Sequence, residues 1–151
     1  MKGDVILFCY DGSEESKHAI EAAAKLLTAR DAIIVDVGEV LTRSESLAAL
    51  SPGVDVSVLE NVNEDAALER AQEGATLARR FGFDAQPRGV VSSPTWDGIL
   101  NLADEVDASV IVVGSRGLTG VRDLVEGSTS RALAKHSTRP VLVIPPAADA
   151  N

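Results

Sequence analysis

The stretch Ser109-Val110-Ile111-Val112-Val113-Gly114-Ser115-Arg116-Gly117 carries the most information about the fold. Residues 110–113 form a continuous run of β-branched apolar side chains, and a glycine-rich turn closes it. A run of this kind, bounded by turn residues, is typical of a strand that is buried on both faces of a parallel sheet. A similar run, Val5-Ile6-Leu7-Phe8, is closed by Asp11-Gly12-Ser13. The two runs predict two central strands.

Strands and helices alternate along the rest of the chain. We expect strands over 5–8, 33–37, 88–91, 109–113 and 141–144, and helices over 14–29, around 68–81, from 92–94 to about 106, and over 128–136. Residues 40–63 read as a long surface connection with one short helix at most. This alternation predicts one α/β domain, a doubly wound and mostly parallel sheet with helices on both faces. Ligands of such sheets bind outside the carboxyl ends of the strands, where the strand order reverses.

Composition excludes several classes of partner. The 151 residues include 23 acidic and 14 basic ones, so the net charge of −9 disfavours nucleic acid and anionic membranes. No apolar stretch approaches the roughly 20 residues that span a bilayer, and the first residues do not resemble a signal peptide. With Cys9 as the single cysteine, no internal disulfide is possible. We therefore expect a cytoplasmic protein.

The turn after residues 109–113 has the features of a phosphate cradle. Glycines at 114, 117 and 127 allow close backbone approach to a ligand. The hydroxyl cluster Ser128-Thr129-Ser130 opens the last helix, where unpaired N–H groups and the helix dipole favour an anion. Arg116 adds a positive charge on the loop. The alternative interpretation takes the glycines as turn residues and Ser128 as a helix cap. Neither the P-loop signature nor the dinucleotide fingerprint is present.

Three segments together resemble the universal stress protein family. The spacing of Gly114, two residues, Gly117, nine residues and Gly127-Ser128 is similar to the ATP-binding motif of that family. The opening segment 5–13, with its Asp-Gly-Ser turn, resembles the first strand and turn of the family. The segment Arg139-Pro140-Val141-Leu142-Val143-Ile144-Pro145 resembles its closing strand. The resemblance covers nearly the whole chain.

This resemblance implies a fold and a site. It implies a five-stranded sheet in the order 3-2-1-4-5 within a domain over 1–146, followed by a polar tail over 147–151. It implies an adenine nucleotide, ATP or its products AMP and ADP, bound with Mg²⁺, and a regulatory role in the stress response. By position, the resemblance implies that the adenosine would be bordered by Cys9, Tyr10 and Asp11, and that adenine would contact the backbone near Val37. The ribose and phosphates would be admitted by Gly114 and Gly117. The phosphates would be held by Gly127, Ser128, Thr129 and Ser130. It also implies a homodimer through residues 141–144, which would otherwise expose an apolar sheet edge.

Two other functions stay open from the residues. One is a family member that binds no nucleotide and acts only through protein contacts. Glu126 beside the cradle and the bulky Tyr10 favour that alternative, whereas the glycine spacing argues against it. The other is an adenylate-forming enzyme of the same architecture, which would need a second catalytic motif. No nucleophile, general base or dedicated metal cluster can be identified, so we expect at most slow ATP hydrolysis.

Overall fold

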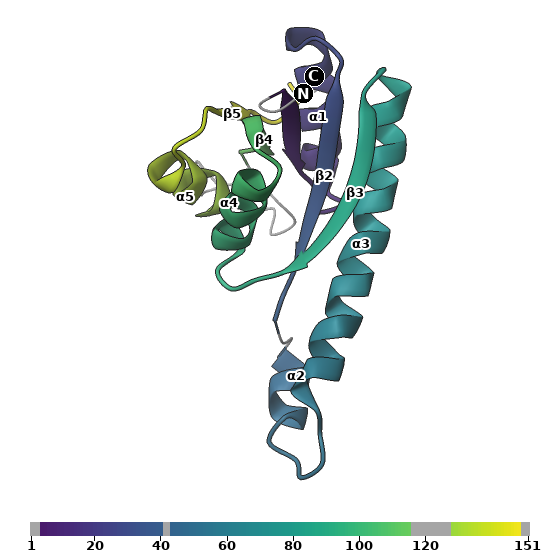
Figure 1. The fold of residues 1–151 in the computed structure, drawn as a ribbon, viewed down its shortest axis with the longest axis vertical. Helices are drawn as coiled ribbons and strands as arrows, with labels where there is room; N and C mark the ends of the chain where they lie inside the picture. Colours follow the sequence, from purple (N-terminus) through teal and green to yellow (C-terminus); the bar gives the residue numbers. More distant parts are fainter. Residues whose placement is uncertain (1–3, 41–42, 116–127, 149–151) are drawn as a thin grey trace.

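Strand β1 (Val5–Cys9) lies at the centre of a parallel sheet (Figure 1). The computed structural model describes residues 4–40, 43–115 and 128–148. The other strands of the sheet are β2 (Asp31–Gly38), β3 (Asp84–Val91), β4 (Ala108–Gly114) and β5 (Val141–Ile144). The strand order is β3-β2-β1-β4-β5, and each neighbouring pair is parallel. The expected fold class and strand order are therefore confirmed.

Helices cover both faces of the sheet, and each face has its own core. Helices α1 (Glu14–Leu26) and α3 (Val56–Arg80) pack on the face that carries Ile6 and Phe8. Helices α4 (Thr95–Glu105) and α5 (Ser128–His136) pack on the face that carries Leu7. Neighbouring side chains of β1 thus enter opposite cores, because side chains alternate along a strand. Each fully buried Ile, Leu or Phe stabilises the fold by roughly 1.5–3 kcal/mol.

The element boundaries agree best where the apolar pattern is continuous. Helix α5 and strand β5 have the expected bounds. Helix α1 ends at Leu26 and not near residue 29, because Leu27 turns to an extended conformation and its N–H donates to the Ala23 carbonyl at 2.8 Å. Strand β3 begins at Asp84, four residues before the expected start. Its polar first half, which includes Pro87, pairs with β2 at the edge of the sheet, where proline is tolerated.

Much of the segment 40–63, which we expected to be a surface connection, is helical. A short helix, α2 (Arg43–Ala48), occupies part of it. The long helix α3 then begins at Val56, capped by Asp55, whose carboxylate accepts a hydrogen bond from the Ser57 N–H at 2.9 Å. Residues 56–63 therefore belong to α3, and the prediction of a loop there was wrong.

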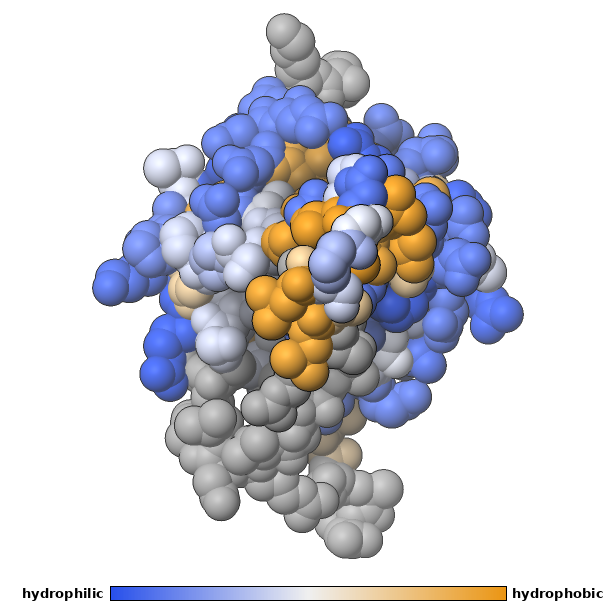
Figure 2. Space-filling view, turned by 90° about the horizontal axis from the view of Figure 1, so that it is seen from below, coloured by the Kyte–Doolittle hydropathy of each residue, from blue (hydrophilic) through white to orange (hydrophobic). Residues whose placement is uncertain are grey.

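Helix α3 extends well beyond the sheet. It has 25 residues, which corresponds to about 37 Å at 1.5 Å per residue. Its buried residues begin only at Ala67, so the first three turns and helix α2 project away from the body of the molecule (Figure 1). Figure 2 looks at this end and shows apolar side chains gathered there within a hydrophilic surround. Over the described ranges, no helix has the length and apolar character that would be needed to cross a membrane.

Candidate functional site

The carboxyl ends of β1, β2 and β4 lie together at one end of the sheet. Asp11 follows β1 after one intervening residue, Val37 is the penultimate residue of β2, and Gly114 ends β4. Because β1 pairs with both β2 and β4, three segments far apart in sequence converge at this end of the sheet. The reversal of strand order lies here, at the place where doubly wound sheets bind ligands.

Asp11 is held by the turn that starts helix α1. Its Oδ1 accepts hydrogen bonds from the backbone N–H of Ser13, at 2.9 Å, and from the Ser13 hydroxyl. Ser13 is in turn the N-cap of α1, and its Oγ accepts from the Ser16 N–H at 3.1 Å. The carboxylate therefore has a fixed position at the strand end, supported by the first turn of the helix.

Cys9 and Tyr10 place their side chains in the two cores. Cys9 is partly buried and packs against the core under α4 and α5, and burial followed by the charge of Asp11 raises the pKa of its thiol to about 12. Tyr10 packs in the core under α1 and α3, close to Gly74, where an added Cβ would come within 2.9 Å of the ring. Burial, and then the Glu73 carboxylate, raise the pKa of Tyr10. The bulk of Tyr10 is thus accommodated beneath α3.

A cavity of about 320 Å³ opens between the ends of β1 and β2 and the side of α3. We call it the strand-end cavity. It contains two of the residues that the sequence analysis singled out, Asp11 and Val37. Its full lining consists of Asp11, Asp36, Val37, Gly38, Glu39, Asn63, Ala66 and Arg70. Three carboxylates and one guanidinium make this cavity negative, which favours hydroxyl and amine donors over phosphate.

The ion pair between Asp36 and Arg70 forms one wall of the strand-end cavity. Arg70 donates from Nε and Nη2 to the two carboxylate oxygens of Asp36, at 2.9 and 3.0 Å. Asp36 is only 2% exposed, whereas the Arg70 side chain is 44% exposed. Burial raises the pKa of Asp36, and the two hydrogen bonds from Arg70 act against that rise. This fork-to-carboxylate geometry fixes the guanidinium at the cavity wall.

Sequence reasoning missed this pair. Asp36 interrupts the apolar run Ile33-Ile34-Val35, and a charged residue inside a buried strand is a signal that a partner exists. Arg70 lies 34 residues away on a helix face rich in other charges, so no local pattern marks it. Asn63, whose side-chain amide donates to Glu45 on α2 at 3.1 Å, also lines the cavity without a signal in the sequence.

A larger cavity of about 600 Å³, the helix-end cavity, lies where helices α4 and α5 begin. Ser128 and Thr129 of the expected cradle line it, whereas Ser130 is buried. The remaining lining is Glu39, Val40, Ser92, Ser93, Pro94, Thr95, Trp96 and Ala132. Hydroxyl groups and the N-termini of two helices dominate this wall, and both offer hydrogen-bond donors. Glu39 lines both cavities, so the two lie side by side.

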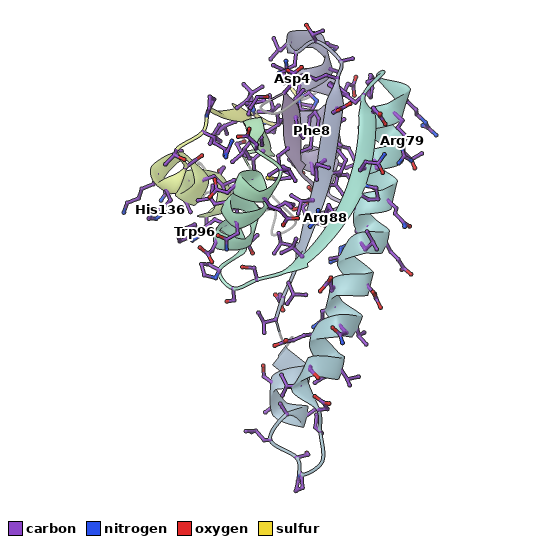
Figure 3. The ribbon with its side chains drawn as sticks, viewed as in Figure 1. Asp4, Phe8, Arg79, Arg88, Trp96 and His136 are labelled. Atoms are coloured by element: carbon purple, nitrogen blue, oxygen red, sulfur yellow. The ribbon has the colours of Figure 1, made fainter. Side chains whose placement is uncertain are left out.

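Trp96 closes one side of the helix-end cavity. Its ring stacks on His136 with centroids 4.3 Å apart and planes 8° apart (Figure 3). No pattern in the sequence predicts this stack, which joins the start of α4 to the end of α5. Trp96 also packs against the core on this face of the sheet.

Part of the expected cradle lies outside the described residues, namely Arg116, Gly117 and Gly127, and so does Glu126 beside it. Within the described residues, Gly114 and Ser128 mark the two ends of that segment, at the end of β4 and the start of α5. No group of three or more candidate metal-ligating side chains occurs over the described ranges.

Comparisons with known proteins agree with this architecture. A family model described as "Universal stress protein family" matches residues 4–145. Universal stress protein YxiE of Bacillus subtilis is 32% identical over 148 residues, covering 92% of this chain and 97% of that protein. The structure of MJ0577, from Methanocaldococcus jannaschii, superposes with a TM-score of 0.77 at 23% identity, covering 99% and 100% of the two chains. A universal stress protein in complex with cAMP superposes with a TM-score of 0.61 at 26% identity, covering 95% and 98%.

Proposed function

Because the chain belongs to the universal stress protein family, we propose that it binds an adenine nucleotide and uses the bound state to regulate partners in a stress response. One observation carries the proposal: Asp11, which follows β1, and Val37 of β2 line a single cavity at the carboxyl ends of the strands. This is the end of the sheet at which doubly wound folds bind ligands, next to the reversal of strand order between β1 and β4. The related protein in complex with cAMP supports the adenine part of the ligand.

We assign different parts of the nucleotide to the two cavities according to their polar groups. Adenine and ribose suit the strand-end cavity, where Asp11 would accept hydrogen bonds from the ribose hydroxyls and the backbone at Val37 would contact the base. The phosphates suit the helix-end side, where Ser128 and Thr129 stand at the N-terminus of α5. Gly114, Gly117 and Gly127 complete the cradle in this proposal. A triphosphate would enter as its Mg²⁺ complex, because Asp11 and Glu39 would otherwise repel it.

The first test is the nucleotide content of the protein purified from cells. After denaturation, near-stoichiometric ATP would support the proposal, and AMP or ADP would indicate that hydrolysis has occurred. Calorimetry with Mg-ATP then compares the wild type with Asp11→Asn, which keeps the Oδ1 acceptor of the turn. Loss of the charge should weaken binding by about 10-fold to 100-fold, the value of a hydrogen bond to a charged group. Gly127→Val should have a larger effect if the cradle holds phosphate.

A matched control is Asp31→Asn, which makes the same change at the exposed amino end of β2. It should change the affinity for Mg-ATP by less than twofold, since Asp31 lies at the opposite end of the sheet, where the strands begin. A protein that is purified empty and also fails to bind added Mg-ATP would contradict the proposal. The nucleotide-free interaction module would then be the better description.

We also propose that the chain forms a homodimer through β5. This strand is at one edge of the sheet, and its residues 141–143 are not fully covered. An apolar edge strand is a template for pairing with a second copy. Sedimentation at high concentration should give a dimer, and Val143→Lys should give a monomer. Gln86→Lys on the other edge strand, β3, is the control, and a wild type that stays monomeric would refute the dimer.

A further inference from the structure

The projecting end of the molecule exposes large apolar side chains that the fold does not use. We call this set the tip surface, and it consists of Leu47, Leu50, Val54, Val56, Val58 and Val62. Leu50 is 82% exposed, and Val58 and Val62 are 54% and 56% exposed. Figure 2 shows apolar residues gathered at this end. Contiguous apolar surface on a projecting element marks an interaction site more often than scattered exposed residues do.

Helix α3 continues this surface with acidic side chains. Val58, Val62, Asp65 and Glu69 follow one another at spacings of four, three and four residues, so they share one helix face. All four are exposed. The buried residues of α3, such as Ala67, Ala71 and Ala78, lie on the opposite face against the sheet. The solvent face therefore presents two valines and then two carboxylates along the helix.

The stability of the chain does not account for this arrangement. Valine is a weaker helix former than Ala, Leu or Glu, and Val58 and Val62 belong to neither core and keep more than half of their surface exposed. Asp65 and Glu69 are four residues apart on a helix, a spacing at which like charges destabilise it. Both features become favourable when another helix covers the valines and brings positive charge to the carboxylates.

The charge of the surroundings decides what kind of occupant fits. Residues 43–69 contain six acidic residues and one basic residue, namely Glu45, Asp55, Glu60, Glu64, Asp65 and Glu69 against Arg43. A second copy docked on this surface would bring two such acidic segments together, and an anionic membrane would be repelled in the same way. We propose that the tip surface and the adjoining α3 face form a docking site for a basic amphipathic helix of a partner protein.

The geometry sets the pattern that this partner helix carries. The midpoint between Val58 and Val62 lies about seven residues before the midpoint between Asp65 and Glu69, which is about 10 Å along the helix. A partner helix lying along α3 would place two apolar residues on the valines and Lys or Arg about two turns away, opposite the carboxylates. In such a contact between two helices, the partner helix presents its anchor residues at i, i+3, i+4 and i+7.

Calorimetric titration with two synthetic peptides tests this proposal on the full chain. One peptide is an amphipathic helix of Leu and Lys, about 18 residues long, and the other has Glu in place of every Lys. The wild type should bind the Leu/Lys peptide and not the Leu/Glu peptide. Val58→Ser with Val62→Ser should weaken binding about 10-fold, the value of roughly 1.4 kcal/mol of lost apolar contact. Asp65→Asn with Glu69→Gln should weaken it about 5-fold at low salt, and less at high salt.

Matched controls lie on α1. Leu26→Ser removes another exposed apolar side chain and Glu21→Gln another exposed acid, and each should change the affinity less than twofold. Equal weakening by tip and control variants, or none by the tip variants, would overturn the proposal, because the peptide would then sense only the overall charge. A wild-type dimer that Val58→Ser with Val62→Ser dissociates would overturn it in favour of a second copy. Binding to anionic lipid vesicles that the same variant abolishes would overturn it in favour of a membrane.

Discussion

At the residue scale, the pairing of Asp36 with Arg70 brings a charge into the end of the core. Asp36 is buried, and its two oxygens receive both hydrogen bonds from a guanidinium that is partly in water. A buried carboxylate is costly unless its partner stays in place. The pair therefore has two effects: it stabilises the end of β2, and it gives the strand-end cavity a rigid wall.

Arg70→Met should destabilise the fold by about 2 kcal/mol at pH 7, less than a fully buried pair would lose because Arg70 is half exposed. The pKa of Asp36 is raised in the folded chain by burial. A carboxyl with a raised folded pKa favours folding below its unfolded pKa, near 4, and loses that contribution as the pH rises. Without Arg70 the pKa of Asp36 is raised further. Arg70→Met should therefore lower the free energy of unfolding by less at pH 4 than at pH 7. Urea unfolding at both pH values measures this.

Arg88→Met is the control for that prediction, because Arg88 is about as exposed as Arg70 but pairs with Glu105, whose carboxylate is 60% exposed. It should cost well under 1 kcal/mol at either pH. An Arg70→Met cost that is the same at pH 4 and pH 7 would mean that Asp36 does not govern the effect.

The Cys9 thiol should be nearly inert in the folded chain. Its pKa of about 12 leaves roughly a thousandth of the thiolate that an ordinary cysteine has near neutral pH. Because the folded pKa exceeds the unfolded one, the thiol favours folding below about pH 9, and this contribution is lost as the pH rises towards 12. Reaction with a disulfide reagent at pH 8 should therefore be slow until denaturant is added. Fast reaction of the folded protein would show that the thiol is open to solvent.

At the element scale, strand β3 and helix α3 approach each other closely at Gly89. A Cβ at this position would lie 2.5 Å from the Glu64 carbonyl oxygen and 2.6 Å from the Leu68 nitrogen. These are backbone atoms of a helix, which cannot shift without moving the element. The small residue therefore sets the distance between α3 and the sheet, and with it the width of the strand-end cavity.

Gly89→Ala should destabilise the fold by about 2–3 kcal/mol, because an overpacked contact against backbone has no cheap relaxation. Gln86→Ala, an exposed change on the same strand, should stay within about 0.5 kcal/mol. Thermal unfolding of both variants measures the difference. A Gly89→Ala protein as stable as the Gln86→Ala protein would show that α3 can move away from β3.

The elements also show where sequence reasoning works. Strands β1, β4 and β5 have continuous apolar runs, and their positions and order were predicted. The first half of β3, Asp84-Ala85-Gln86-Pro87, has no such run, because its strand character comes from pairing with β2. The start of α3 depends on one cap, Asp55, in a stretch whose composition is that of a loop. Long-range pairing and single caps are the features that a local pattern does not contain.

The candidate site divides in the same way. Asp11 and Val37 were predicted, and both line the strand-end cavity, because a strand end is visible as the end of an apolar run. Arg70 and Asn63 reach that cavity from a helix that begins far along the chain, so their role depends on tertiary structure. Cys9 and Tyr10 were chosen for their position next to Asp11, and alternation along the strand directs their side chains into the two cores.

At the scale of the whole molecule, a ligand at the strand ends would connect the two cores. The two layers of helices lie on opposite faces of the sheet, and the proposed nucleotide would contact Asp11 in the turn before α1 and Ser128 at the start of α5. Binding to the folded chain alone should therefore stabilise the whole domain and not one helix.

Mg-ATP at 100 times its dissociation constant should raise the free energy of unfolding by about 2.7 kcal/mol. For a domain of this size, that corresponds to an increase in Tm of roughly 5–10 °C. Scanning calorimetry of the wild type and of Asp11→Asn at one fixed Mg-ATP concentration measures the effect, which should be smaller in the variant. An unchanged Tm in the wild type would agree with a protein that takes no nucleotide.

The stack of Trp96 on His136 makes the molecule its own optical reporter. The chain has a single tryptophan, so all of its indole emission comes from one wall of the helix-end cavity. Anything that enters beside Ser128 and Thr129, or that separates α4 from α5, changes the polarity or the quenching around that one ring. Intrinsic fluorescence can therefore follow occupancy and helix movement here in real time, without a label and without a substitution.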